Sequence, residues 1–375
     1  MQENSKEETE DELRMEREHA AKPALRGILN LQEMEDVARK VLSKKVLAYY
    51  SSASDDEITY QENERAFSRF FFHPRVLRPI FGADPSTTIL GFSSSIPVFV
   101  SSAGLAKLGH PLGEANITRG AGHAGIIQLV SSNASLSYAE IASHRVSPEQ
   151  TLFFQLYKHR DDDYAAERVR EVVKRGYKAI WLTVDAPFSG NRERDVRAGW
   201  EAEDMERLRQ QGRKAGQGKA GARTDMPKKP EDLEEIEEEL DLRGTSGALV
   251  ANDDTDMTWH KTIPWLRSIT KVPIVIKGIQ CVEDAILAAE SGVDGILLSN
   301  HGGRQLDYTL PPLEVLYKLR IQRPDIFEKL EGQPSDIFAS PSVPNRHRET
   351  VYIDGGVKRG TGEGHHHSED QTVTY

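Results

Sequence analysis

Short apolar runs alternate with amphipathic stretches along most of the chain. The runs are three to six residues long and lie at residues 97–101, 126–130, 152–156, 179–184, 273–277, 295–299 and 351–353. Helical patterns separate them, as at residues 165–175 and 282–290. This alternation predicts βαβ units and a parallel sheet. Seven strands favour an α/β fold of the (β/α)8 TIM-barrel class that lacks its eighth β/α unit, with an open doubly wound sheet as the alternative.

The amino-terminal part predicts one helix behind a charged arm. Residues 1–24 are rich in Glu, Lys and Arg, which indicates a solvated helix or a disordered arm. Asn30, followed three positions later by Glu33, has the spacing of a helix cap, and we expect the helix to reach Leu47. An apolar stripe on this helix is expected to pack in the core and consists of Leu31, Met34, Val37, Ala38, Val41 and Leu42.

Composition limits the class of protein. The 375 residues are 38% hydrophobic, which suffices for one sizeable core, so a single barrel needs no second domain. The formal charge of −11 argues against a nucleic-acid surface. Cys281 is the only cysteine, so no internal disulfide can form and a reducing compartment is expected. No apolar run is long enough to span a bilayer, and the acidic amino terminus is unlike an import leader. We therefore expect a cytoplasmic protein, with a mitochondrial or peroxisomal location as the alternative.

The alternation is interrupted from about residue 200 to residue 242. This stretch is crowded with Lys, Arg, Glu and Gly and lacks an apolar stripe, which is typical of a mobile lid or, equally, of a solvated helix. The expected organisation is therefore a charged arm at 1–24, a barrel domain at 25–361 that contains this insert, and a polar tail at 362–375. The histidine triplet of the tail, residues 365–367, is interpreted as incidental and not as a metal site.

One polar, glycine-rich loop follows the apolar run at 295–299 and is the first candidate for chemistry. It contains His301, two glycines and Arg304. Histidine takes up a proton near neutral pH, and arginine holds a carboxylate through two parallel hydrogen bonds. The carboxyl ends of barrel strands are where active sites lie. The alternative is a loop whose His301 and Arg304 cap a helix or pair with acids.

Six short motifs, in order through the chain to about residue 361, resemble those of one enzyme family. They are Tyr49-Tyr50, Gln155-Leu156-Tyr157, Leu182-Thr183-Val184-Asp185-Ala186-Pro187, Ile276-Lys277-Gly278, the loop at 298–307 and Asp354-Gly355-Gly356. Together they resemble the FMN-dependent family that oxidises L-2-hydroxy acids, which includes glycolate oxidase and the flavocytochrome-type L-lactate dehydrogenases. Residues 31–72 look closest to the lactate dehydrogenase branch. The resemblance implies a TIM-barrel enzyme that uses FMN to convert a small L-2-hydroxy acid into its 2-oxo acid.

The resemblance also assigns catalytic and substrate-binding roles. His301 would be the base, and Asp185 would pair with its imidazolium. Arg304 and Arg192 would hold the substrate carboxylate, for which a guanidinium fork is better suited than an ammonium. The remaining substrate contacts would come from Tyr49, Asn133 and Tyr157, and Tyr157 would also be catalytic, because it would flank the reacting hydroxyl group. Without the resemblance, Asp185 could equally cap a helix, Arg192 pair with a surface acid, and the tyrosines pack in the core.

The cofactor contacts implied by the resemblance are spread over several strand ends. The isoalloxazine ring would lie against the backbone of Ser102, Ala103 and Gly104 and contact the polar side chains of Ser131, Gln155, Thr183 and Ser299. Lys277 would stabilise the negative charge of the reduced ring, and the alternative is a lysine that reaches out to solvent. The phosphate would be held by Asp354, Gly355, Gly356, Lys358 and Arg359. Lys358 stands where the family usually has arginine.

The end of the chain departs from the family. After Thr361 the family continues through a helix, an eighth strand and closing helices, whereas this sequence continues into the polar tail. A barrel without its last strand leaves two open edges, so low stability and weak FMN binding are expected. A homo-oligomer, a tetramer in the family, is expected if the barrel closes. Two alternatives are an inactive barrel kept as a binding or assembly module and another FMN- or phosphate-binding barrel enzyme.

Overall fold

The computed structural model describes residues 17–77, 79, 82–201, 245, 247, 249–328 and 350–354. The chain divides into two compact units. The amino-terminal unit comprises Met1–Ser52, Asn191–Ala248 and Lys358–Gly362, and the barrel unit comprises Ala53–Gly190, Leu249–Val357 and Glu363–Tyr375. The predicted lid and polar tail, and most of the charged arm, lie outside the described residues. Those expectations therefore stay predictions.

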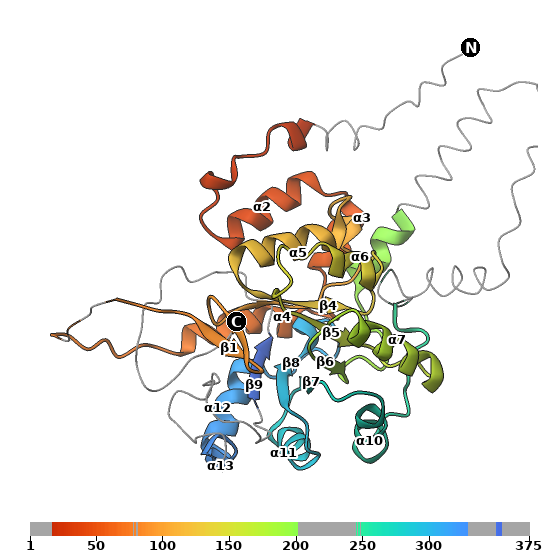
Figure 1. Cartoon of the computed structure of the whole chain (residues 1–375). Helices are drawn as coiled ribbons and strands as arrows, with labels where there is room; N and C mark the ends of the chain where they lie inside the picture. Colours follow the sequence, from red (N-terminus) through yellow and green to blue (C-terminus); the bar gives the residue numbers. More distant parts are fainter. Residues whose placement is uncertain are drawn as a thin grey trace, which may run out of the picture. The chain divides into compact units, whose positions relative to one another are not determined.

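Seven parallel strands form the main sheet of the barrel unit (Figure 1). They are β3 Phe99–Val100, β4 Ile127–Ser131, β5 Leu152–Leu156, β6 Ile180–Thr183, β7 Ile274–Ile279, β8 Gly295–Ser299 and β9 Thr350–Asp354. The hydrogen-bonded order of the strands is their order along the chain. A doubly wound sheet would reverse that order at a switch point. The doubly wound alternative is therefore wrong, and the barrel class is confirmed.

Within the described residues, β3 and β9 are the two end strands of the sheet. The sequence after Asp354, where an eighth unit would follow, lies outside the described residues. The expectations of a missing eighth unit, low stability and weak FMN binding thus stay untested.

Two apolar layers lie on opposite faces of the sheet, because side chains alternate along each strand. The face that meets the helices carries Val130, Phe154, Leu182, Ile276 and Leu298 within the larger core cluster. The opposite face, which a barrel encloses, carries Leu129, Phe153, Trp181, Val275 and Leu297. The antiparallel hairpin of β1 Thr87–Ile89 and β2 Phe92–Ser94 packs against this enclosed layer. The strands are consequently buried on both faces, as their continuous apolar runs predict.

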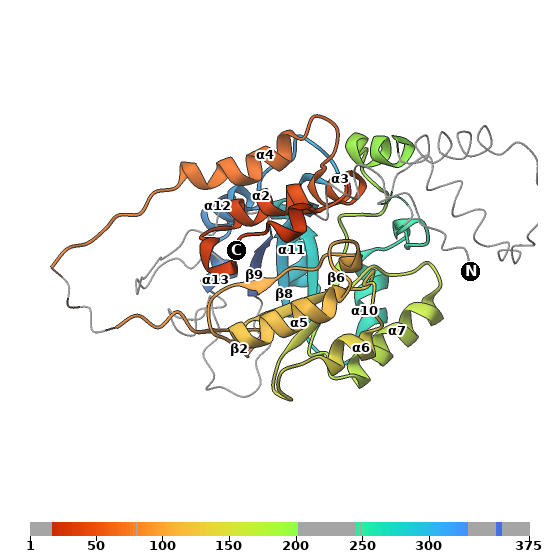
Figure 2. The same cartoon turned by 90° about the horizontal axis from the view of Figure 1, so that it is seen from above.

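Helices connect the strands and lie along the outer side of the sheet (Figures 1 and 2). They are α5 Gly113–Ala124, α6 Tyr138–Ser143, α7 Asp162–Lys174, α10 Trp259–Ile269, α11 Val282–Glu290, α12 Pro312–Gln322 and α13 Pro324–Glu328. The predicted bounds of α11 are the observed ones, whereas α7 begins three residues early because Asp161 caps it. Before the sheet, α4 Ile58–Arg65 continues into η2 Ala66–Arg69. None of the described helices is both long and apolar enough to cross a membrane.

The amino-terminal unit corrects two predictions. Asn30 caps α2 Leu31–Val41 as expected, since its side chain accepts a hydrogen bond from Glu33 N (2.9 Å). The predicted single helix to Leu47 is wrong, because Ser43 caps a second helix, α3 Lys44–Ser51. The apolar stripe is not core either. No residue of α2, all of which the structure describes, is buried.

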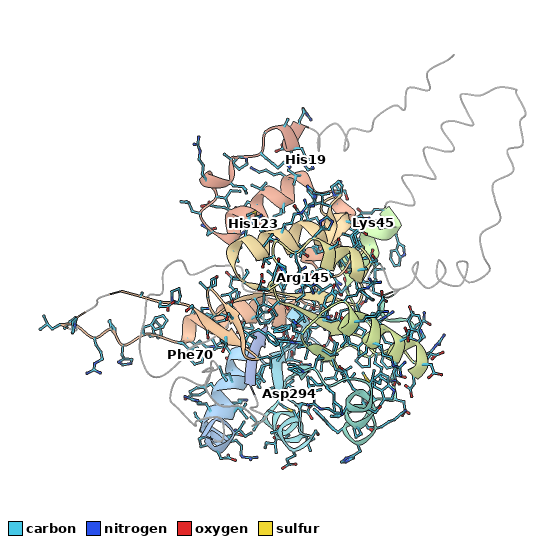
Figure 3. All side chains as sticks on the ribbon, viewed as in Figure 1. His19, Lys45, Phe70, His123, Arg145 and Asp294 are labelled. Carbon is cyan, nitrogen blue, oxygen red and sulfur yellow. The ribbon has the colours of Figure 1, made fainter. Side chains whose placement is uncertain are left out.

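An ion pair fixes the end of the sheet at which β7 and β8 begin. Asp294 is labelled in Figure 3. Its Oδ2 accepts hydrogen bonds from Ile274 N (2.7 Å) and from the guanidinium of Arg267 on α10 (2.6 Å). In barrels, residues at this end serve stability and not chemistry. The candidate chemistry is therefore sought at the opposite, carboxyl ends of the strands.

Candidate active site

Polar side chains replace apolar ones where the enclosed face reaches the carboxyl ends of the strands. Two positions beyond members of the enclosed layer, on the same face, lie Ser131, Gln155, Thr183, Lys277 and Ser299. All five side chains are buried. We call these residues the polar row. All five were predicted to contact FMN.

Three members of the polar row form a hydrogen-bonded chain. Ser131 Oγ donates to Gln155 Oε1 (3.1 Å), and Gln155 Nε2 donates to Thr183 Oγ1 (2.7 Å). Both neighbours thereby fix the orientation of the Gln155 carboxamide. The next residue, Ser132, accepts a hydrogen bond from Tyr157 N (3.0 Å) instead. Of the two adjacent serines, Ser131 is thus the one in the row.

Lys277 is buried beside an acid. Its Nζ lies 3.9 Å from Asp185 Oδ2 and donates to Ser299 Oγ (3.4 Å). The pairing of β7 with β8 shifts register just after Lys277, at Gly278, whose φ is 115°. A Cβ at Gly278 would lie 2.6 Å from Asp185 Cβ, so only glycine permits this approach. Because Lys277 is 4% exposed, the alternative of a lysine reaching into solvent is wrong.

His301 is held between Asp185 and Tyr157. The distance from His301 Nδ1 to Asp185 Oδ1 is 2.8 Å, and the distance from Nε2 to the Tyr157 hydroxyl oxygen is 3.0 Å. His301 has a φ of 57°, in the left-handed region, and Gly302 and Gly303 follow with φ of 66° and 71°. A non-glycine residue held in this region stores about 1–3 kcal/mol of strain, and such strain clusters at functional sites. The three residues predicted as catalytic partners therefore meet at the ends of β5, β6 and β8.

The Asp185 side chain is fully buried, whereas the His301 imidazole is partly exposed to solvent. The two side chains are 0% and 22% exposed. Burial alone would raise the pKa of Asp185, but the positive charge of Lys277 and the adjacent His301 outweigh it and hold that pKa below its ordinary value. Asp185 is consequently a carboxylate at neutral pH. A proton accepted at His301 Nε2 would leave an imidazolium with a fixed counter-charge at Nδ1.

The loop that carries Arg304 is tied to the segment after β6. Gln305 accepts a hydrogen bond from Gly190 N (2.8 Å) and donates to Phe188 O (3.1 Å). The Arg304 guanidinium folds back over the loop, where Nη1 donates to Gly302 O (3.3 Å). Arg304 thus lies in the same loop as His301, as the sequence requires. Its predicted role toward a substrate carboxylate stays a prediction.

Asn133 lies beside the polar row. Its backbone N donates to Ser131 Oγ (3.1 Å), and its side-chain Nδ2 donates to Leu249 O (3.3 Å). Leu249 is helical and precedes the loop that leads to α10. Asn133 is therefore placed next to the predicted cofactor contacts, and the Leu249 carbonyl orients its carboxamide.

Tyr49 and Arg192 lie together in the amino-terminal unit. The guanidinium of Arg192 lies over the Tyr49 ring, with its Cζ 5.4 Å from the ring centroid. It also donates to Tyr49 O and, at 3.1 Å, to Ser52 Oγ. Arg192 is 5% exposed, so the alternative of a surface ion pair is wrong. The substrate contacts predicted for Tyr49 and Arg192 stay predictions.

Glu114 on α5 is a structural residue that the sequence did not reveal. Its Oε1 accepts from Ala106 N (3.0 Å) and Ser135 N (2.8 Å), which ties the loop after β3 to the loop after β4. The first of these loops contains Ser102, Ala103 and Gly104, the predicted backbone contacts of the ring. Glu114 thus fixes the spacing of two loops at the site. A glutamate early in a helix gives no sequence signal for such distant partners.

The predicted phosphate site is described only at its first residue. Asp354 is the last residue of β9. Gly355, Gly356, Lys358 and Arg359 lie outside the described residues. Their roles stay predictions.

Two neighbouring acids in the loop before α10, Asp253 and Asp254, have opposite pKa shifts. Burial raises the pKa of Asp253 to about 7, and the charge of Arg168 lowers it only in part. Its Oδ2 is buried without a hydrogen-bond partner among the described residues. For Asp254, burial is outweighed by the hydrogen bond from Lys158 Nζ (2.7 Å), so its pKa is lowered. The ionised form is thus disfavoured at Asp253 and favoured at Asp254.

Replacing Asp253 by Asn should stabilise the protein at alkaline pH. In the wild type, Asp253 lowers the stability progressively as the pH rises from the ordinary carboxyl pKa to about 7, because only the unfolded state ionises freely. We expect Asp253→Asn to add about 2–3 kcal/mol more stability at about pH 8 than at about pH 5. Asp254→Asn, the matched control, should lose about 2 kcal/mol at the higher pH because Lys158 loses a charged hydrogen bond. Urea unfolding at both pH values measures these differences, and a pH-independent effect of Asp253→Asn would contradict the assignment.

Comparisons with known proteins agree on one family. The family described as FMN-dependent dehydrogenase matches residues 38–362 of the chain. An L-lactate dehydrogenase (cytochrome) of Wickerhamomyces anomalus is 40% identical over 91% of this chain, and glycolate oxidase 3 of Arabidopsis thaliana is 35% identical over 89%. A solved mutant of flavocytochrome b2 with pyruvate bound superposes with a TM-score of 0.73 at 35% identity, covering 94% of this chain and 75% of its own.

The relatives differ in how much of their own length they share with this chain. The chain spans 52% of the Wickerhamomyces protein and 53% of a second L-lactate dehydrogenase (cytochrome), from Saccharomyces cerevisiae. It spans 79% of glycolate oxidase 3. The residues matched by the family, 38–362, contain the sheet and the site described above.

Proposed function

Because the chain belongs to the FMN-dependent dehydrogenase family, we propose that it oxidises a small L-2-hydroxy acid to the corresponding 2-oxo acid. The observation that carries this proposal is the position of His301, whose imidazole lies between the buried Asp185 carboxylate and the Tyr157 hydroxyl at the strand ends. The similar proteins are named for L-lactate and glycolate, both small 2-hydroxy acids, and one was solved with pyruvate, the 2-oxo acid of lactate. Lactate and glycolate are therefore the substrates to test first.

FMN is the cofactor of this family, and the polar row suits it chemically. The row offers hydroxyl groups at Ser131 and Thr183, a carboxamide at Gln155 and an ammonium at Lys277. These groups match the carbonyl and N–H edges of a planar flavin ring, and the ammonium suits an edge that gains negative charge. When bound, FMN supplies the two-electron acceptor for the oxidation. The residues of the row would hold it.

The chain's own residues supply the proton acceptor. His301 Nε2 would accept a proton from the substrate, and Asp185 would hold Nδ1 and stabilise the imidazolium. The Tyr157 hydroxyl, 3.0 Å from Nε2, would donate to or accept from the reacting hydroxyl group and keep it near the base. The polar row and the apolar layer beneath it exclude water on the enclosed side.

Replacing Arg304 by Lys should weaken binding of both substrate and product. The planar fork of arginine grips a carboxylate with two bonds, and a lysine ammonium provides a single point charge. We expect KM for the 2-hydroxy acid and Ki for the 2-oxo acid to rise by roughly 10-fold, the equivalent of one charged hydrogen bond. Steady-state kinetics with product inhibition measures both. A loss confined to kcat would contradict a binding role.

The test of the function is turnover of the whole chain supplied with FMN and an artificial electron acceptor. Formation of the 2-oxo acid is measured for L-lactate, D-lactate and glycolate. We expect turnover with L-lactate or glycolate and none with D-lactate. Flavin binding without 2-oxo acid from any substrate would overturn the proposal and leave the alternative of an inactive barrel that serves as a binding module.

A further inference from the structure

We propose that Asn63 is a positioning residue for the reaction proposed above. Through a reciprocal amide pair with Asn300, it holds the turn that carries His301 against helix α4. This inference deepens the proposed function and rests on it. We call residues 300–303 the His301 turn.

The two carboxamides pair with each other in both directions. Asn63 Nδ2 donates to Asn300 Oδ1 (3.0 Å), and Asn300 Nδ2 donates to Asn63 Oδ1 (2.7 Å). Both residues are buried, at 2% and 1% exposure, although 237 positions separate them in the sequence. A buried carboxamide without partners is strongly disfavoured, so removal of one member leaves a vacant donor and acceptor on the other.

The side-chain carboxamide of Asn300 cannot rotate without losing hydrogen bonds, because it also closes the His301 turn. Its Oδ1 accepts from Gly303 N (3.1 Å), and its Nδ2 donates to Leu310 O (3.2 Å). All four of its hydrogen-bonding sites are therefore used. The three residues that follow Asn300 have left-handed backbone, and His301 is the only one that is not glycine. The pair with Asn63 thus fixes the orientation of the Asn300 side chain, which closes the strained His301 turn by accepting from Gly303 N.

Further contacts pack α4 directly against the His301 turn. A Cβ at Gly303 would lie 2.6 Å from Tyr60 N, so the backbones of α4 and the turn touch. Gly303 O accepts from Ser54 N (2.9 Å). The first turn of α4 receives no cap from Glu57, and Asp307 caps it instead by accepting from Thr59 N (2.7 Å). The side chain of Asn63 on α4 contacts Asn300, the residue that directly precedes His301.

The first test separates positioning from substrate binding. Asn63→Ala should lower kcat by roughly 10–100-fold, because a displaced imidazole loses its alignment, while KM and FMN content change little. Glu64→Ala, an exposed neighbour on the same helix, is the control and should leave both constants unchanged. An Asn63→Ala variant with wild-type kcat, or one whose loss lies only in KM, would overturn the proposal.

The second test uses a variant whose pairing depends on protonation. In Asn63→Asp the new carboxyl can donate to Asn300 Oδ1 only when protonated, so the reciprocal pair is restored at acid pH. We expect the ratio of kcat for Asn63→Asp to that for the wild type at the same pH to rise several-fold as the pH is lowered from about 8 to about 5.5, because burial at this position raises the pKa of the new carboxyl group. A ratio that does not change with pH would overturn the proposal. This arm still decides the matter if Asn63→Ala fails to fold.

A third measurement does not depend on activity. The imidazole signals of the whole chain, labelled with ¹⁵N in histidine, are recorded by NMR, and His301 is assigned by its loss in His301→Gln. Asn63→Ala should shift or broaden the His301 signal, and Glu64→Ala should not. An unchanged His301 signal would overturn the proposal. If the wild type has no activity but Asn63→Ala moves the signal, the proposed function fails and the positioning role stands.

Discussion

Replacing His301 by glutamine is expected to lower turnover by roughly 10²–10⁴-fold, the usual contribution of a general base. Glutamine can still form hydrogen bonds with Asp185 and Tyr157, but it cannot accept a proton near neutral pH. Substrate binding and FMN content should therefore change little. Stopped-flow reduction of the flavin by substrate isolates the affected step from reoxidation.

The matched control is His123→Gln, an exposed histidine on α5 (Figure 3). It should reduce the flavin at the wild-type rate. Equal rates for His301→Gln and the wild type would show that another group takes the proton, and the assignment of His301 would fail.

Replacing Asp185 by asparagine should reduce turnover by a similar amount, roughly 10²–10⁴-fold, by analogy with other histidine–carboxylate pairs. The asparagine oxygen can still accept from Nδ1 and orient the ring, but the imidazolium loses its counter-charge. The change also leaves the Lys277 ammonium, 3.9 Å from Asp185 Oδ2 in the wild type, without its buried partner. Asp163→Asn, at an exposed position of α7, is the control. Retention of turnover within about two-fold by Asp185→Asn would contradict the role.

The pH dependence of Asp185 follows from the sign of its shift. Its pKa is held below the ordinary carboxyl value, so the stability it contributes is present above that value and is lost only as the pH falls through the lowered pKa. We therefore expect no loss of turnover from protonation of Asp185 between about pH 5 and about pH 8. Asp185→Asn should lower turnover by the same factor throughout this range. A wild-type decline in the same range must arise from another group.

The strands were predictable because the apolar runs end abruptly. The runs at 152–156 and 295–299 end at the residues where β5 and β8 end, since both faces of these strands are buried. The amino-terminal helix was mispredicted for the converse reason. Its apolar spacing continues past Val41, and only the cap formed by Ser43 reveals the break.

The site was predictable only in part. The resemblance of short motifs named His301, Asp185 and Tyr157, and the structure brings both Asp185 and Tyr157 within hydrogen-bond distance of His301. The contact between Asn63 and Asn300 could not be predicted, because a reciprocal amide pair depends on burial and on the packing of distant segments. The shifted pKa of Asp253 could not be predicted for the same reason, since the sequence does not distinguish a buried aspartate from an exposed one.

Anaerobic titration of the FMN-loaded chain with L-lactate and, separately, glycolate tests directly whether the chain oxidises a 2-hydroxy acid. We expect one of them to bleach the visible absorbance of the oxidised flavin completely and to form one 2-oxo acid per flavin. Bound flavin that neither acid reduces, but that dithionite reduces fully, would contradict it.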